Sequence, residues 1–222
     1  MDLGTGQEIK THKIHTIGEA EGVPMEKVYK HTVITRIMHW AHAISMVILA
    51  LTGLQIYAPD SFRLFASMDW ARYLHFVCMY VVVWTMVYKI YYVLVTGEIK
   101  ELLFTFKDLV AFPGLVAHYL YGIFVGKKKK DWGKFNPGQK LIYTAWPVLM
   151  LLQAITGFAL YWPGFFAGFN DLLGGLGYVR LWHFCISWMF ILTMVVHLYL
   201  GSTGATIIDY YKSMLTGWEK AH

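Results

Sequence analysis

Apolar residues are gathered into long stretches that carry almost no formal charge. Three stretches, at 37–59, 141–170 and 181–208, contain no Asp, Glu, Lys or Arg, and a fourth, at 73–97, contains only Lys89. A helix needs about 20 apolar residues to cross a hydrocarbon core about 30 Å thick, so each stretch is long enough. We therefore expect an all-α membrane protein, a four-transmembrane-helix bundle with helices at 35–57, 73–95, 141–162 and 179–201.

Lys and Arg are distributed unevenly among the connecting segments. The segment up to Arg36, the stretch 89–140 and the C-terminal tail together hold 16 of them, and the two remaining loops hold 3. Because cytoplasmic loops carry an excess of Lys and Arg, we expect both termini to lie in the cytoplasm.

The stretch 109–125 is apolar but contains Pro113 and His118. If it crossed the membrane, the four lysines at 127–130 would be translocated, against the charge bias. We therefore expect an interfacial helical segment between the second and third spans, broken at Pro113.

The membrane part of the chain is expected to cover residues 33–212. Residues 1–32 are polar and lack the apolar centre of a signal peptide, so they are expected to form a cytoplasmic N-terminal extension. Residues 213–222 are expected to form a cytoplasmic tail.

Composition narrows the function classes. The chain is 57% hydrophobic and only 15% charged, with a net charge of +5, whereas soluble domains are about 25% charged. This composition argues against a disordered or nucleic-acid-binding protein. Two cysteines are too few for a disulfide framework or a thiolate metal cluster.

Histidines inside the expected spans are the main candidates for chemistry. An ionisable side chain within a membrane is costly unless it is paired, and is therefore a functional candidate. A lone histidine is ordinarily a hydrogen-bonded core residue, but five at matching depths favour a function. The five are His39, His42, His75, His183 and His197.

The spacing of these histidines predicts two pairs. His183 and His197 are fourteen residues apart, which is about 1400° of helical rotation and about 21 Å of rise. They therefore share one face at opposite leaflets. His75 and His183 each follow an arginine on the outer side by three residues, so they match in depth. His39 enters from the cytoplasmic side at a depth similar to that of His197.

Two facing histidine pairs, one in each leaflet, suit two b haems with bis-imidazole ligation. The outer haem would use His75 and His183, and the inner haem His39 and His197. A zinc site would need three or four ligands converging on one point. A proton relay would usually bring carboxylates into the membrane, and the cores of the spans contain none.

Three further polar residues are haem propionate candidates. His42 lies three positions from His39, so one of the two can ligate iron while the other hydrogen-bonds a propionate or a neighbour. Arg36 and Arg180, at the membrane edges, could form charge-assisted bonds to propionates. Anchoring at the membrane interface is the alternative explanation for both arginines.

A short pattern is repeated near the outer ends of the first and third spans. Leu51-Thr52-Gly53-Leu54 and Ile155-Thr156-Gly157-Phe158 share a Thr-Gly pair. A glycine there lets a neighbouring helix or a flat ligand approach the backbone. Helix packing alone would also explain either glycine.

These features together resemble a known family, the membrane cytochrome b subunits of respiratory formate dehydrogenases and nickel-iron hydrogenases. The resemblance covers residues 33–212. It is carried by Arg36-Ile37-Met38-His39-Trp40, one histidine early in the second span, the pair His183 and His197, and Asn136-Pro137-Gly138-Gln139.

The resemblance implies a subunit that carries electrons rather than the primary catalytic subunit. An iron-sulfur subunit, itself bound to a catalytic subunit, would pass electrons through two b haems to menaquinone or ubiquinone in a prokaryotic cytoplasmic membrane. Asn136, Gly138, Gln139 and His197 would line the quinone site. Without the resemblance, Asn-Pro-Gly is first of all a turn.

Two other functions remain open at this stage. Related subunits of sulfur-compound reductases oxidise quinol and carry electrons in the opposite direction. A haem-free membrane anchor would also have apolar spans, but it would not need paired histidines.

Overall fold

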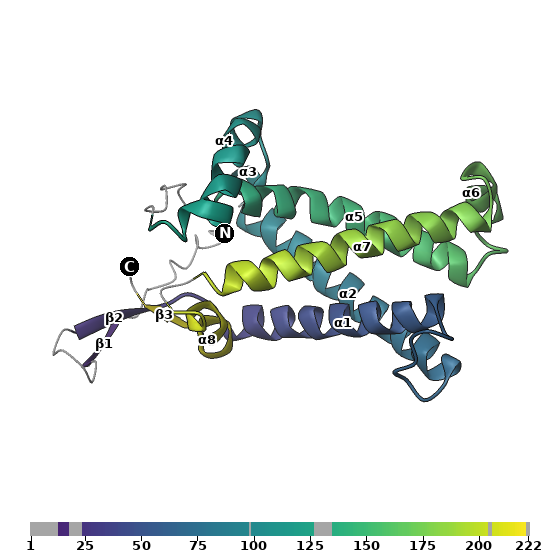
Figure 1. The fold of residues 1–222 in the computed structure, drawn as a ribbon, viewed down its shortest axis with the longest axis horizontal. Coiled ribbons are helices and arrows are strands. Elements are labelled where there is room, and N and C mark those ends of the chain that lie inside the picture. Colours follow the sequence, from purple (N-terminus) through teal and green to yellow (C-terminus); the bar gives the residue numbers. More distant parts are fainter. Residues whose placement is uncertain (1–12, 18–23, 98, 127–134, 204–205, 221–222) are drawn as a thin grey trace, which may run out of the picture. The chain divides into compact units, whose positions relative to one another are not determined.

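A computed structural model describes residues 13–17, 24–97, 99–126, 135–203 and 206–220. Over these residues the chain is mostly helical (Figure 1). Four helices are long and apolar enough to cross a membrane, which confirms the four expected spans and makes the chain a multi-pass membrane protein. They are α1 (Val33–Tyr57), α2 (Met68–Thr96), α5 (Pro137–Tyr161) and α7 (Leu176–Gly201).

The four spanning helices leave many large apolar side chains exposed and bury several polar ones. Many of their large apolar residues are exposed, including Val77, Leu151 and Leu192. Their buried polar side chains are Ser45, Thr52, Gln55, Thr85 and Thr156. Lipid tails are as apolar as leucine, so a helix in a membrane can leave apolar residues on its outside and place small polar residues at helix contacts.

Helix α2 begins at Met68 rather than at residue 73. Its N-cap is Ser67, whose hydroxyl oxygen accepts a hydrogen bond of 3.1 Å from the backbone N–H of Trp70. Its C-cap is Gly97, in the left-handed conformation with φ 71°. Both are common helix boundaries, but the apolar pattern alone does not mark them.

The described part of the connection from α2 to α5 is largely helical, but the helix is not broken at Pro113. It contains α3 (Ile99–Leu102), α4 (Phe106–Ala117) and the π-helix η1 (His118–Gly122). Pro113 lies inside α4. The proline ring removes one helical N–H. A capping box at the start of α4 stabilises the helix and so helps to offset the missing hydrogen bond. The regular helix ends later, at Ala117.

The two ends of the described chain form a small sheet. The expectation of an all-α chain is therefore wrong for these segments. The antiparallel strands are β1 (Lys13–Ile17), β2 (Pro24–Tyr29) and β3 (Trp218–Lys220), in the order β1-β2-β3. Tyr29 pairs with Trp218, and their rings meet edge to face at 5.2 Å. Such aromatic cross-strand pairs stabilise a sheet, and here they join the N-terminal extension to the C-terminal tail.

Two short helices complete the described part. Helix α6 (Ala167–Leu172) lies in the connection between α5 and α7, and α8 (Asp209–Thr216) precedes β3. Gly217, between α8 and β3, offers its carbonyl to the backbone N–H groups of Lys30 and His31 at 2.8 and 3.2 Å. The start of α1 is therefore tied to the end of α8.

The chain divides into two compact units. One consists of residues 1–47 and 189–222, and the other of residues 48–188. His39 and His197 belong to the first unit, and His75 and His183 belong to the second. Each expected histidine pair therefore lies within a single unit.

Candidate haem sites

His75 on α2 and His183 on α7 face each other. Their ring centres are 6.4 Å apart and the planes are inclined by 57°. Both residues are half-buried. Around them, Tyr57 of α1 stacks on Phe184 of α7 at 4.4 Å. The structure thus brings together the two residues expected to form the outer pair.

His39 on α1 and His197 on α7 form the second facing pair. Their ring centres are 6.2 Å apart and the planes are inclined by 46°. Trp40 lies edge-on to His39 at 5.5 Å, and its indole N–H donates to the Met214 carbonyl at 3.1 Å. His42 is half-buried one turn further along α1. It is therefore His39 whose ring is paired with that of His197.

Both separations fit two imidazoles on one metal ion. A metal–imidazole bond is about 2.0–2.1 Å and the ring centre lies about 1.1 Å behind the nitrogen, so two imidazoles that face one metal ion from opposite sides would have ring centres about 6.2–6.4 Å apart. The measured values are 6.2 and 6.4 Å. Among the described residues no group of three or more His, Cys, Asp or Glu could hold a metal ion. The pairs therefore suit an iron whose remaining ligands come from a porphyrin.

Each histidine of the His75/His183 pair contacts a threonine through Nδ1. The Thr52 hydroxyl oxygen lies 2.9 Å from Nδ1 of His75, and that of Thr156 lies 3.0 Å from Nδ1 of His183. Each hydroxyl also donates to the carbonyl four residues earlier on its own helix, at 2.7 and 2.8 Å. We did not predict a role for either threonine, although the repeated Thr-Gly pattern was the signal that could have found them.

The glycine that follows each threonine lies against the same imidazole. A Cβ added at Gly53 would lie 3.5 Å from Cε1 of His75, and one added at Gly157 would lie 3.2 Å from Cε1 of His183. The second distance is tighter than most real Cβ contacts. The glycines therefore keep space beside the imidazoles that a side chain would take.

Gln153 and Ser187 also contact His183. The amide nitrogen of Gln153 lies 2.7 Å from the Ser187 hydroxyl and 3.2 Å from Nε2 of His183. Nε2 is the nitrogen that faces iron when Nδ1 is hydrogen-bonded elsewhere. If Nε2 bound iron, it would lose its contact with the Gln153 amide. That amide would keep its hydrogen bond to the Ser187 hydroxyl.

The His39/His197 pair has different surroundings. Nδ1 of His39 is buried and has no hydrogen-bond partner within the part of the chain that the structure describes. His197 is exposed. A buried nitrogen without a partner on His39, next to the exposed His197, is consistent with a site that binds a further group.

The two arginines expected near propionates differ in their surroundings. Arg36 is half-buried and donates from its guanidinium to the Leu215 carbonyl of α8. It therefore helps to tie α1 to the C-terminal helix. Arg180 is exposed on α7.

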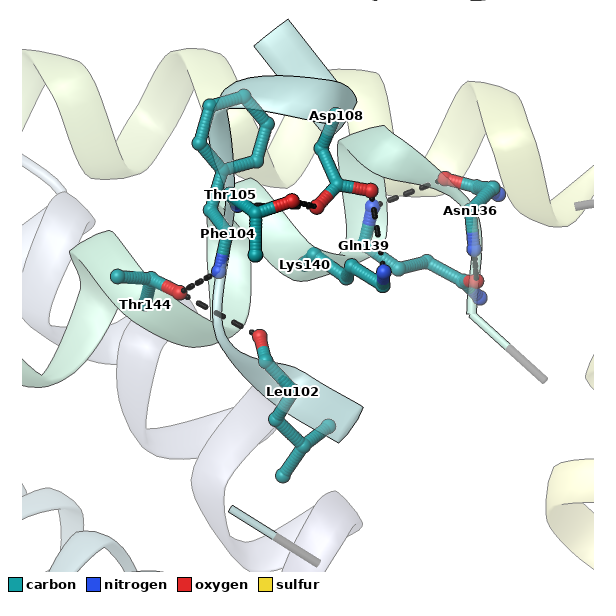
Figure 2. A network of polar contacts seen from close by, with 8 residues as sticks. All are labelled: Leu102, Phe104, Thr105, Asp108, Asn136, Gln139, Lys140 and Thr144. Carbon is teal, nitrogen blue, oxygen red and sulfur yellow. Dashed lines mark hydrogen bonds and ion pairs between the residues drawn. The ribbon is translucent and has the colours of Figure 1, made fainter. Parts of the chain in front are cut away.

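Three of the four residues expected at the quinone site, Asn136, Gly138 and Gln139, lie at the start of α5. Figure 2 shows Asn136 and Gln139. The fourth, His197, lies on α7. Asn136 is the N-cap: its side-chain oxygen accepts from the Gln139 N–H at 2.9 Å, and the Gln139 side-chain oxygen accepts from the Asn136 N–H at 3.0 Å. Gly138 lies close to α4, since an added Cβ would be 3.0 Å from Cδ2 of Leu115. Both carboxamide oxygens serve the cap, so these side chains can offer a ligand their NH2 groups.

A polar network beside this cap was not expected from the sequence (Figure 2). Lys140 of α5 forms an ion pair of 3.0 Å with the buried Asp108 of α4. A hydrogen bond from the Thr105 hydroxyl is the main reason why the pKa of Asp108 is lowered, and Lys140 lowers it further. Thr144 accepts from the Phe104 N–H at 2.9 Å. The spacing of Thr105 and Asp108 is that of a capping box, which could have identified this site.

Membrane-spanning helices that hold two facing pairs of histidines define a membrane cytochrome b. Residues 30–217 match the family described as prokaryotic cytochrome b561, and the chain belongs to this family. Membership implies that the chain binds b haem.

Curated relatives cover most of the chain. A probable Ni/Fe-hydrogenase B-type cytochrome subunit of Azotobacter vinelandii is 28% identical over 89% of this chain and 92% of its own length. The F420 non-reducing hydrogenase II cytochrome subunit of Methanosarcina mazei is 24% identical over 84% of this chain and 80% of its own. The putative cytochrome YdhU of Escherichia coli is 26% identical over 93% of this chain and 82% of its own.

Proposed function

We propose that the chain is a two-haem subunit that carries electrons between a hydrogenase and the membrane quinone pool. The observation that carries this proposal is the spacing of the two histidine pairs. Ring centres at 6.2 and 6.4 Å fit bis-imidazole ligation in both pairs. A haem-free anchor would have no reason to hold four imidazoles at this spacing.

The residues of the chain bind and orient the two groups. His75 and His183 would hold one haem, and His39 and His197 the other. Bound b haem supplies reversible one-electron chemistry. Gly53 and Gly157 keep space beside the first pair. Arg36, His42 and Arg180 remain the candidates for propionate contacts.

The names of the relatives favour hydrogen as the source of electrons. The proteins from Azotobacter vinelandii and Methanosarcina mazei are named as hydrogenase cytochrome subunits. We therefore favour a hydrogenase over a formate dehydrogenase or a sulfur-compound reductase as the partner. An iron-sulfur subunit on the outer side would deliver electrons to the His75/His183 haem.

A quinone site at the start of α5 completes the proposal. Asn136, Gly138 and Gln139 would line it. The NH2 groups of the two carboxamides are suitable donors to a quinone carbonyl, which lacks hydrogen-bond donors of its own. Menaquinone or ubiquinone would be the acceptor.

The proposed orientation places both termini in the cytoplasm. The distribution of Lys and Arg supports it, and the pairing of β2 with β3 supports a common side for residues 24–29 and 218–220. The residues at 109–125 would lie at the cytoplasmic interface between the second and third spans. The segments 1–32 and 213–222 would flank the membrane domain at 33–212.

This orientation gives the electron path an energetic consequence. Electrons released outside and delivered to a quinone that takes protons from the cytoplasm carry negative charge inwards. Moving one charge through 100 mV corresponds to about 2.3 kcal/mol. Such a subunit would help to build the membrane potential.

Haem analysis of the intact complex tests the proposal. The chain is purified from its native membranes together with the proteins that bind it, and b haem is extracted and quantified per chain. We expect two haems per chain and a reduced b-type spectrum after addition of hydrogen. One haem or none per chain would refute the two-haem proposal. Reduction by formate but not by hydrogen would refute the hydrogenase assignment.

A further inference from the structure

The hydrogen bonds around His183 determine which nitrogen carries the proton. The Ser187 hydroxyl donates to the His183 carbonyl at 2.7 Å, so its oxygen accepts from the Gln153 amide at 2.7 Å. The same amide nitrogen lies 3.2 Å from Nε2 of His183 and can donate only to an unprotonated Nε2. In a neutral imidazole the proton is then on Nδ1.

The threonine contact at the other nitrogen agrees with this assignment. The Thr156 hydroxyl proton is given to the Leu152 carbonyl at 2.8 Å, which leaves the oxygen as an acceptor. The N–H at Nδ1 of His183 therefore donates to Thr156 across 3.0 Å. Both contacts thus agree with a proton on Nδ1 and an unprotonated Nε2, the nitrogen that would bind iron in place of the Gln153 amide.

His75 is held in the same way by an equivalent residue on another helix. The Thr52 hydroxyl donates to the Ile48 carbonyl at 2.7 Å, so it accepts from Nδ1 of His75 at 2.9 Å. Thr52 is fully buried and Thr156 is 4% exposed, so water does not compete strongly with either contact. The two Thr-Gly pairs serve the two histidines in matching roles.

We infer that Thr52 and Thr156 are positioning residues that hold His75 and His183 with Nε2 towards iron and lower the midpoint potential of the haem between them. This inference rests on the proposed function. A hydrogen bond from Nδ1–H to an acceptor fixes the ring orientation and raises the basicity of the ligating nitrogen. A more basic ligand stabilises oxidised iron, which lowers the potential.

In the other pair, the buried Nδ1 of His39 has no hydrogen-bond partner within the described residues. The His39/His197 haem should therefore be the one with the higher midpoint potential. Electrons would then move downhill from the His75/His183 haem to the His39/His197 haem. The direction matches the proposed path from the outer side to the quinone.

The test uses threonine variants in the complete complex. Thr52→Val and Thr156→Val remove the hydroxyl and keep a branched side chain, whereas Thr52→Ser and Thr156→Ser keep the hydroxyl. Thr193→Val is the matched control, since the Thr193 hydroxyl also donates within its helix, to the carbonyls of Met189 and Phe190 at 2.9 and 3.0 Å. Haem content and the midpoint potentials of both haems are measured by optical redox titration.

We expect full haem content in these variants and an upward shift of one midpoint potential in each valine variant. The shift should be larger in the double valine variant, and it should be absent in Thr193→Val and in the serine variants. If a valine variant loses haem, retention by the matching serine variant would still support the hydroxyl. Unchanged potentials at full haem content, an equal shift in Thr193→Val, or haem loss in the serine variants as well would overturn the inference.

The same measurement separates this inference from the proposed function. Two haems per wild-type chain with unshifted potentials in the valine variants would remove the role of the threonines and leave the two-haem proposal intact. Fewer than two haems in the wild-type complex would refute the proposed function, and the inference with it.

Discussion

His39 and His197 face each other with ring centres 6.2 Å apart, although they come from near opposite ends of the chain. Helix α7 supplies one ring to this pair and another, from His183, to the pair with His75. A single helix therefore takes part in both candidate haem sites through different residues. Substitutions at these two positions of α7 should separate the sites.

Replacement of His197 by alanine should remove one haem and leave the other. The reason is that His75 and His183 keep both imidazoles in that variant. His183→Ala should have the reciprocal effect, and the remaining haem should differ from that in His197→Ala in its midpoint potential. Haem content per chain and optical redox titration are the measurements.

His118→Ala is the control for these two variants, because His118 lies in η1 outside both pairs. It should retain both haems. Loss of both haems in His197→Ala, from a chain that still assembles with its partners, would contradict independent pairs.

The two roles of Asn136 can be separated by the choice of substitution. Asn136→Asp keeps an oxygen that caps α5 and removes the NH2 group, whereas Asn136→Ala removes both. We expect Asn136→Asp to reduce quinone turnover without loss of stability, because a carboxylate suits a helix N-terminus. Asn136→Ala should lower turnover and also destabilise the helix start by about 0.5–2 kcal/mol.

Haem reduction by hydrogen and reduction of quinone are measured separately in the same membranes for both Asn136 variants. Haem reduction should remain normal, since electrons would arrive through the other end of the path. Normal quinone turnover in Asn136→Asp would show that Asn136 only caps the helix and does not bind quinone.

The spans and the pairing of the histidines could be predicted because each depends on local geometry. The length of an apolar stretch determines whether it can cross a bilayer. The helical repeat determines that His183 and His197 share a face. The depth of each histidine follows from its distance to the charged residues that bound its span.

The contacts of buried polar side chains could not be predicted, because they depend on how the chain packs. Gln55 is an example: its side chain is 2% exposed and binds the backbone of the α1–α2 connection at Leu64, Phe65 and Ser67. In the sequence it is only a polar residue near the end of an apolar stretch. The Thr-Gly repeats were visible, but the histidine that each threonine binds is on another helix.

The strands were missed for a related reason. β3 has three residues, and its partner β2 lies near the other end of the sequence. A short strand of this kind is stabilised by its neighbour rather than by its own pattern. Local alternation of polar and apolar residues therefore gives little signal.

Alanine at the two glycines of the Thr-Gly pairs should have unequal effects. In Gly53→Ala the new Cβ would be in ordinary contact with His75 at 3.5 Å, whereas in Gly157→Ala it would press on His183 at 3.2 Å. Both variants gain up to about 1 kcal/mol in helix propensity. We expect Gly53→Ala to keep both haems and Gly157→Ala to hold one of them more weakly.

Haem retention during purification and the thermal midpoint of unfolding in detergent check this difference. Each glycine variant serves as the control for the other. Stronger haem loss in Gly53→Ala than in Gly157→Ala would contradict the expectation that haem binding depends more on the space beside His183 than on that beside His75.

Removal of the Asp108 carboxylate should weaken the contact between α4 and α5 in a pH-dependent way. The pKa of Asp108 is lowered from 3.8, so its ionised form stabilises the folded chain above that pH, and the contribution is lost as the pH falls through the lowered pKa. We expect Asp108→Asn to lower the Tm by about 2–4 °C at neutral pH. The difference from wild type should begin to narrow below about pH 4.

Thermal unfolding of the purified protein across this pH range is the measurement. Asp60→Asn, at an exposed carboxylate in the α1–α2 connection, is the control and should leave the Tm unchanged. A Tm difference for Asp108→Asn that stayed constant down to pH 3 would show that the charge of the Asp108 carboxylate is not its source.

The junction of β2 with β3 also constrains the order of assembly. Tyr29 is synthesised before any of the four spans, and Trp218 after all of them, so their pairing cannot form until the last helix has been inserted. Contacts between residues so far apart in sequence are slow to form. An odd number of insertions would leave the two strands on opposite sides of the bilayer. The pairing of β2 with β3 therefore forms last, and only in a chain in which an even number of spans has been inserted.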